Sequence, residues 1–228
     1  MTEDKPLTFS GNSYVRWRLT VPLERRLSLS LELRTVQDKA RLMHAVGRVD
    51  YSILEVRCQS LILFLATPER LCTCSCDITQ RAKRPMFHFQ IIDGMIQFRF
   101  ECGSGPGKVR VDRVLINDGY WHTVVVERIN KSVKLVVDGY VVEGSGPGSN
   151  DILNLDGNDV FFGAEVEMLA HGFEEIRNGF NGCMQHIKFD LIELPLSGSS
   201  SVGSLQHYQD IQFHCADIYF PGGLSTYV

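Results

Sequence analysis

Residues 27–33 read LSLSLEL, and this stretch decides the fold. Its four leucines alternate with two serines and a glutamate. Successive side chains of a β-strand point to opposite faces, so the leucines share one face and the polar residues share the other. A shift of the strand by one residue would expose the whole leucine row. We therefore expect this strand to have a fixed register in a sheet with one buried face.

The same period of two returns in short segments along the whole chain. These segments are rich in Val, Ile, Leu, Phe and Tyr, and no long amphipathic helix pattern lies among them. The clearest are Ser13–Leu19, Met95–Glu101, Trp121–Arg128, Ser132–Val137 and Gly182–Phe189. Many short strands of this kind predict an all-β fold, an antiparallel two-sheet sandwich.

Turn residues punctuate these segments. Asp-Gly pairs occur at residues 93–94, 118–119, 138–139 and 156–157. Asp and Gly tolerate the positive φ angles of tight hairpin turns, which join antiparallel neighbours. The pair at 138–139 predicts a hairpin between Val133–Val137 and Tyr140–Val142.

Composition narrows the possible functions. The 228 residues carry 23 Lys and Arg against 27 Asp and Glu, a formal net charge of −4. Without a basic stripe, nucleic acid is not an expected partner. The most apolar run, Leu61–Ala66, is too short to span a membrane, and the polar start Met1–Pro6 does not resemble a signal peptide. These residues are therefore not expected to span a membrane themselves.

The chain is expected to form one domain with less structured ends. We predict a disordered leader over residues 1–8, a domain over 9–215 and a C-terminal tail over 216–228. Ser197–Ser204 (SGSSSVGS) is interpreted as a flexible connection before a last strand-like segment, Leu205–Phe213. Tyr120 and Trp121 are expected in the sandwich core or at its edge.

Several segments in one order resemble the laminin G-like (LNS) domain. They are FSGNSYVRWRL at 9–19, LSLELRTVQ at 29–37, NDGYWHTV at 117–124, VFFGA at 160–164 and GFNGCMQHI at 179–187. DYSILEV at 50–56 and ECGSGPG at 101–107 resemble most closely the copy in Fat-type cadherins. The resemblance implies a curved jelly-roll sandwich in the extracellular part of a single-pass adhesion receptor. It further implies binding of a protein or glycan partner at the sandwich rim, without catalysis.

A calcium site at the rim is also implied by the resemblance. Calcium takes about six to eight oxygen ligands, and an open site completed by water binds with a Kd on the order of 10⁻⁴–10⁻³ M. The alternative is that the aspartates concerned are ordinary turn residues. The implied set combines side chains from two loops, their neighbours and two main-chain carbonyls: Asp50, Asp156, Asn154, Asp159, and the carbonyls of Glu101 (or Phe100) and Leu155.

Three of the seven cysteines match the family pattern. The resemblance implies a disulfide between Cys183 and Cys215, which would pin the segment after Ser197–Ser204 onto the sandwich. Closing a loop of about thirty residues stabilises by roughly 3–4 kcal/mol in the chain-entropy model. Cys102 has no evident partner and is interpreted as a small buried hydrophobic residue.

Residues 57–91 depart from the family pattern. There, DYSILEV is followed almost at once by a turn and the next strand; without residues 57–91, Val56 and Ile92-Asp93-Gly94 would form that hairpin directly. The intervening stretch is long for an uncovered loop, and it carries the remaining cysteines, Cys58, Cys72, Cys74 and Cys76.

Three explanations of this insertion stay open. A soft-metal site could use its thiolates, although the usual spacing is Cys-x₂-Cys and not Cys-x-Cys-x-Cys. The second explanation is a splice insert at a binding rim. A retained intron or a gene-model error is favoured here, because composition changes abruptly and turn signals are missing. If the insertion is translated, its thiols favour mixed disulfides in an oxidising compartment.

The remaining signals concern modification and the rival function. Asn130-Lys131-Ser132 is a glycosylation sequon at a predicted turn. His122 is interpreted as hydrogen-bonded beside a turn, and no Ser/His/Asp or Cys/His set predicts an enzyme. The rival function is a lectin or a glycosidase on the same fold. A glycan rim would need basic residues near the ion, for which Arg48, Arg110 and Arg113 are candidates.

Overall fold

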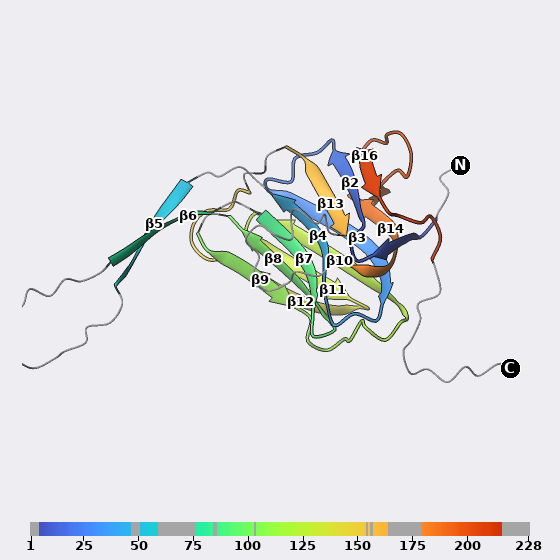
Figure 1. The fold of residues 1–228 in the computed structure, drawn as a ribbon, viewed down its shortest axis with the longest axis horizontal. Coiled ribbons are helices and arrows are strands. Elements are labelled where there is room, and N and C mark those ends of the chain that lie inside the picture. Colours follow the sequence, from blue (N-terminus) through green and yellow to red (C-terminus); the bar gives the residue numbers. More distant parts are fainter. Residues whose placement is uncertain are drawn as a thin grey trace, which may run out of the picture.

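The structure is a computed structural model that describes residues 5–46, 51–58, 76–83, 86–102, 104–153, 155, 157–163 and 179–215. For residues 46, 51–58, 76–83 and 86–88 the backbone alone is described. All regular elements within these ranges are β-strands (Figure 1). Their bounds are β1 Leu7–Ser10, β2 Tyr14–Leu19, β3 Arg26–Thr35, β4 Lys39–Val46, β5 Tyr51–Cys58, β6 Cys76–Lys83, β7 Met86–Ile92, β8 Met95–Glu101, β9 Pro106–Arg110, β10 Trp121–Ile129, β11 Ser132–Val137, β12 Tyr140–Ser145, β13 Asp159–Gly163, β14 Asn181–Phe189, β15 Ile192–Glu193 and β16 Gly203–Gln209.

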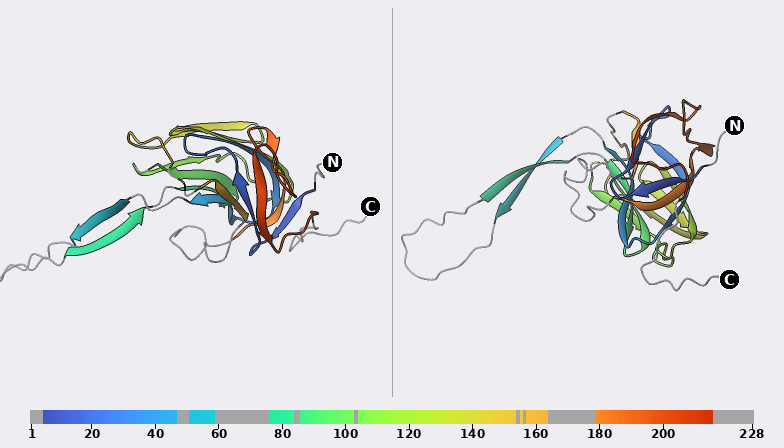
Figure 2. Two further views of the ribbon diagram at one scale, coloured as in Figure 1. Left: turned by 90° about the horizontal axis from the view of Figure 1, so that it is seen from above. Right: turned by 45° about the vertical axis from the view of Figure 1, so that its right-hand side comes forward.

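Two sheets, each of seven strands in the described residues, form the body of the molecule. The first has the order β1-β14-β3-β10-β11-β12, with β15 beside β14, and the second has the order β16-β2-β13-β4-β7-β8-β9. Neighbouring strands within them run antiparallel. Figures 1 and 2 show the sheets stacked face to face. The predicted antiparallel two-sheet sandwich is confirmed.

Strand β3 contains LSLSLEL and buries the leucine face, as the sequence predicted. All four leucines of 27–33 are at most 2% exposed and face the core between the sheets. Burying such a side chain contributes roughly 1.5–3 kcal/mol. Strands β10 and β14 flank β3, so its register is fixed from both sides. Trp17 and Phe162 of the second sheet pack edge to face in the same core, with 5.5 Å between their ring centroids.

Two of the predicted Asp-Gly turns close hairpins. Asp93-Gly94 joins β7 to β8 with φ angles of 53° and 71°, and Asp138-Gly139 joins β11 to β12 with 47° and 82°. Positive φ at both central positions matches the right-handed twist of the flanking strands. The predicted hairpin from Val133 to Val142 is confirmed.

The N-terminal boundary differs from the prediction. Residues 7 and 8, assigned to a disordered leader, belong to β1, which pairs with β14. Leu7 and Phe9 alternate into the core, and burial of this apolar pair outweighs the polar surroundings that suggested a leader. At the other end, the strand expected over Leu205–Phe213 runs from Gly203 to Gln209, so it includes the last two residues of the predicted flexible connection Ser197–Ser204. The predicted tail, 216–228, lies outside the described residues.

The predicted place of two aromatic residues is wrong. Tyr120 is 74% exposed and Trp121 is 36% exposed. In β10 the inward positions are His122, Val124, Val126 and Arg128, so period-two alternation turns Trp121 toward solvent.

Strand β7 changes the interpretation of residues 57–91. It lies between β4 and β8 in the second sheet, and its Phe89 and Ile91 are buried. Residues 86–91, which were assigned to the insertion, therefore belong to the sandwich, and β7 is the strand that enters the Asp93-Gly94 turn. Strands β5 and β6 form a two-stranded sheet of their own, which projects from the sandwich in both figures. The insertion's relation to the family pattern stays a prediction.

No helix in the described ranges has both the length and the apolar character needed to span a membrane.

Candidate ligand-binding rim

One end of the second sheet assembles the positions that the implied calcium site requires. We call this end the rim: β4 and β8 end there, and β7 and β13 begin there. The register sets Val46 opposite Met86 and Met86 opposite Glu101. Phe161 of β13 opposes His44 of β4, so the start of β13 lies beside the end of β4. The loops after β4 and before β13 therefore leave the sandwich at the same end.

Among the expected calcium ligands, Glu101 and Leu155 lie within the described residues. Asp50, Asn154 and Asp156 lie outside the described residues. Glu101 ends β8, and its Oε1 accepts a hydrogen bond of 2.8 Å from the Gly105 amide, which closes the following loop. Leu155 is half-buried against the core, and its amide donates to the Leu153 carbonyl at 3.0 Å. Within the described ranges, no group of three or more His, Cys, Asp and Glu side chains is arranged so that it could hold a metal ion.

Asp159, the acidic neighbour in the rim loop, is held by two arginines. Arg18 donates from Nε to Oδ1 at 2.8 Å and from Nη2 to Oδ2 at 3.1 Å, while Arg16 donates from Nε and Nη2 to Oδ2. The hydrogen bond from Arg18, opposed by burial and aided by Arg16, lowers the pKa of Asp159. Both carboxylate oxygens of Asp159 thus accept hydrogen bonds from a pair of guanidinium groups.

A buried arginine on the first sheet anchors the rim loops. Arg128, near the end of β10, is fully buried. Its Nη1 donates to the Asn130 carbonyl at 2.6 Å, and its Nη2 donates to the Leu23 carbonyl and, at 3.1 Å, to the Glu24 carbonyl. Burial lowers the pKa of Arg128 to about 10, so the guanidinium remains charged at neutral pH. Charged donors make the stronger hydrogen bonds to buried carbonyls.

The loop held by Arg128 continues to the predicted calcium loop. The Glu24 carbonyl also accepts from the Leu153 amide at 2.9 Å. Arg25 pairs with Asp151 at 3.2 Å. One main-chain hydrogen bond and one ion pair therefore fix the chain just before residues 154–156. Arg128 was not predicted from the sequence, although its inward place in the alternation of β10 was a signal for it.

The glycosylation candidate lies at the same end. Asn130 is in the turn between β10 and β11, where Ile129 opposes Ser132. It has a φ of 54°, and its amide donates to the Arg25 carbonyl at 2.7 Å. The residue is half-buried. Lys131, beside it, donates from Nζ to the Gly148 carbonyl at 2.6 Å.

The candidate basic residues do not gather at the rim. Arg110 opposes Gln97 in β8, and its guanidinium contacts Asp112 at 2.7 Å and Asp93 at 3.8 Å. Strand β9 starts at the rim and runs away from it, which puts Arg110 at the opposite end. Arg113 follows in the exposed turn after β9. Arg48 lies outside the described residues.

His122 forms a charged cluster at the end opposite the rim. Its Nδ1 lies 2.6 Å from Asp138 Oδ2, and its Nε2 lies 2.9 Å from Asp118 Oδ1. Burial alone would lower the pKa of His122, but the two carboxylates outweigh burial and raise it. Burial likewise opposes the shift at Asp118, where the hydrogen bonds from His122 and the Tyr120 amide lower the pKa. The predicted role of His122 beside a turn is confirmed.

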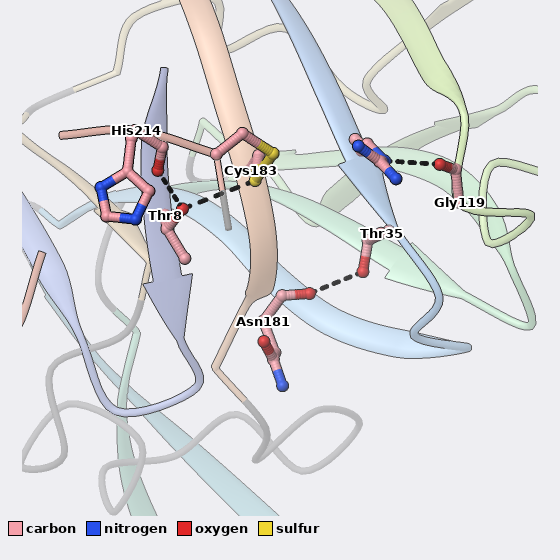
Figure 3. The surroundings of a disulfide bond; sticks show 8 residues. Thr8, Thr35, Gly119, Asn181, Cys183 and His214 are labelled. Atoms are coloured by element: carbon pink, nitrogen blue, oxygen red, sulfur yellow. Dashed lines mark hydrogen bonds between the residues drawn. A yellow bond between two sulfur atoms is a disulfide. The ribbon is translucent and has the colours of Figure 1, made fainter. Parts of the chain in front are cut away.

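The two ends of the domain meet at a disulfide. Cys183 in β14 and Cys215 after β16 are bonded, with 5.6 Å between their Cα atoms, and this is the pair that the resemblance implied. Figure 3 shows Thr8 of β1 beside them, where its Oγ1 donates to the His214 carbonyl and lies 3.6 Å from Cys183 Sγ. Cys102 is a buried free thiol whose pKa is raised by burial.

Comparison with known proteins matches this geometry to one family. The family described as "Laminin G domain" matches residues 76–192. The Fat-like cadherin-related tumor suppressor homolog of Drosophila melanogaster is 36% identical over 219 residues, and human Protocadherin Fat 1 is 34% identical over 215 residues. Each match covers 92% of this chain, which spans 4% of either relative's length. The solved LG1-3 region of the laminin alpha2 chain aligns with a TM-score of 0.65 at 18% identity, covering 93% of this chain and 35% of that one.

Proposed function

Because the chain belongs to the laminin G domain family, we propose that it is a non-enzymatic recognition module in the extracellular part of a cadherin-type adhesion receptor. Its site is the rim, where it takes a protein or glycan partner. The relatives support an extracellular adhesion module. The single-pass membrane parent belongs to the proposal, because this chain spans only a small part of the relatives.

The observation that carries this proposal is the convergence of chain segments at the rim. Strand ends from the second sheet meet there, and on the first sheet Arg128 fixes the loop at residues 23–25. The β5–β6 ribbon joins the body at the same place, since it is inserted between the end of β4 and the start of β7. Function is commonly carried by loops that a rigid scaffold positions. A sandwich end with anchored loops is a surface of this kind.

Calcium is the proposed cofactor of the rim. Asp50 and Asp156 would supply carboxylate oxygens, with Asn154 as a further side-chain donor. The main-chain carbonyls of Glu101 and Leu155 would complete the protein ligands. Hard oxygen donors of this kind suit calcium, and a site open to water suits the millimolar calcium outside cells. The convergence of the loops before β13 and after β4 supports this set. Bound calcium would neutralise the carboxylates and hold the two loops together.

A glycan array and a heparin column test which class of partner the rim takes. The folded chain is applied at about 0.15 M salt, where exposed charges more than roughly 8 Å apart are screened. The formal charge of −4 and the place of Arg110 at the end opposite the rim argue for weak heparin retention. Retention that Asp50→Ala abolishes and Asp112→Ala does not would favour a glycan at the rim. Binding to a cell-surface protein with the same dependence would favour a protein partner. Cleavage of any sugar would contradict a non-enzymatic module.

A further inference from the structure

Strands β5 and β6 bring two of the unexplained cysteines to one register position. The ribbon pairs without a break from Tyr51 opposite Lys83 to Cys58 opposite Cys76. Cys58 and Cys76 are therefore the last pair at the end of the ribbon away from the sandwich (Figure 1). Register partners on antiparallel strands share a face of the ribbon.

The backbone spacing of such a pair suits a disulfide. Opposed residues on antiparallel strands have Cα atoms about 4.5 or 5.5 Å apart, depending on whether the pair is hydrogen-bonded. Disulfides span Cα separations of roughly 4.4–6.8 Å, so either kind of pair fits. The disulfide between Cys183 and Cys215 in this chain has a Cα separation of 5.6 Å.

The position of the ribbon outside the sandwich is a second argument for a cross-link. It forms a separate two-stranded sheet that projects away from the sandwich (Figures 1 and 2). An isolated two-stranded hairpin is marginally stable at best in water, and secreted segments without a core of their own are commonly stapled by disulfides. Among the other described cysteines, Cys183 and Cys215 are bonded to each other and Cys102 is buried in the sandwich.

We propose that Cys58 and Cys76 form a cross-strand disulfide that clamps the β5–β6 ribbon. The proposal rests on the proposed extracellular function, because the bond requires an oxidising compartment. Each thiol loses its proton and the pair gives up two electrons as the S–S bond forms. A small-molecule disulfide of the secretory compartment, such as oxidised glutathione, accepts them and is reduced to two thiols. The clamp fixes the ribbon that leaves the sandwich at the rim.

Peptide mapping of the 228-residue chain, secreted from eukaryotic cells, tests this pairing. Free thiols are alkylated under non-reducing denaturing conditions, and the chain is digested with trypsin. Cleavage after Arg57, Arg70 and Arg81 leaves Cys58 in peptide 58–70 and Cys76 in peptide 71–81. The expected product is the two peptides joined, with the mass of their sum less two hydrogen atoms. Reduction separates them.

Two variants identify the sulfur atoms, because peptide 71–81 also contains Cys72 and Cys74. The joined peptides persist in the C72S/C74S variant and disappear in C76S, whose peptide 58–70 is alkylated. The bond between Cys183 and Cys215 in the same digest is the control for an oxidising compartment. If that bond forms while Cys58 and Cys76 are both alkylated, or Cys58 joins another cysteine, the pairing is wrong. If neither bond forms, the proposed location fails and the clamp fails with it.

Discussion

Replacing Arg128 with methionine is the sharpest test of how the rim is held. Methionine fills a similar volume in the core but carries no donor. The Asn130, Leu23 and Glu24 carbonyls would lose their guanidinium hydrogen bonds. Leu23 is buried, whereas the contacts to the other two are partly open to solvent. Water can therefore replace part of the loss at Asn130 and Glu24 but little of it at Leu23.

The expected cost follows from these three contacts. A buried carbonyl left without a donor costs about 1–3 kcal/mol, and the two part-buried carbonyls cost less. Removing a buried charge also recovers part of its desolvation penalty. We expect a net loss of about 3 kcal/mol, a large share of a stability that is typically about 5–15 kcal/mol. Equilibrium unfolding in urea, followed by tryptophan fluorescence, measures it as a lower midpoint at unchanged slope.

Arg26→Met is the matched control. Arg26 is in β3, its side chain is 69% exposed, and it pairs with Asp190 at 3.2 Å. Exposed ion pairs contribute about 0–1 kcal/mol, so this variant is expected to stay close to the parent chain. Arg128→Lys keeps the charge without the planar guanidinium, so its loss of stability should lie between the losses of Arg128→Met and Arg26→Met. If Arg128→Met loses less than about 1 kcal/mol, or no more than the control, Arg128 does not anchor the rim.

Three further predictions concern the rest of the domain. The pKa of His122 is raised, so its ion pairs stabilise fully below the unfolded pKa of about 6.5 and the benefit is lost as pH rises through the folded pKa. Asp118 has a lowered pKa, so its benefit holds above about pH 4 and is lost as pH falls further. The urea midpoint of His122→Gln should therefore lie furthest below that of the parent chain between about pH 4 and 6.5; a gap that does not change with pH contradicts the cluster. Replacing Cys183 and Cys215 together by serine should cost about 3–4 kcal/mol in the same urea assay, and an unchanged midpoint would show that the bond stabilises nothing. Secreted chain should lose mass on treatment with an N-glycosidase, and Asn130→Gln should abolish that loss; a mass unaffected by the enzyme contradicts glycosylation at the turn.

The period of two in the sequence predicts much of the sandwich, for a physical reason. LSLSLEL could bury its leucines only as a strand with one face in a core, and each hairpin with Asp-Gly needed positive φ at two successive positions. These are local properties of a few residues. The order of strands in the sheets is not a local property, because β3 lies between β10 and β14, which are far away in sequence.

The failures of the prediction also have physical causes. Leu7 and Phe9 are too short a signal to mark a strand, and they are buried because β14 is there to pair with β1. Trp121 was expected inside because of its size, but alternation in β10 decided its direction. Strand β7 was hidden inside a stretch that its cysteines marked as atypical.

The candidate site was predictable in place but not in detail. Strand ends identified from the sequence put Glu101 and Asp159 at one end of the sheet. The partners of Asp159 could not be predicted, since Arg16 and Arg18 come from a strand more than a hundred residues earlier and meet it only through the register of β2 with β13.

Calorimetric titration with calcium tests the central claim, that this rim is a calcium-assisted recognition site. The folded chain is titrated beside Asp50→Ala and beside Asp112→Ala, an exposed acidic control at the opposite end. We predict one site with a Kd on the order of 10⁻⁴–10⁻³ M, lost in Asp50→Ala and kept in Asp112→Ala. No heat at millimolar calcium, or the same heat after Asp50→Ala, would contradict the account.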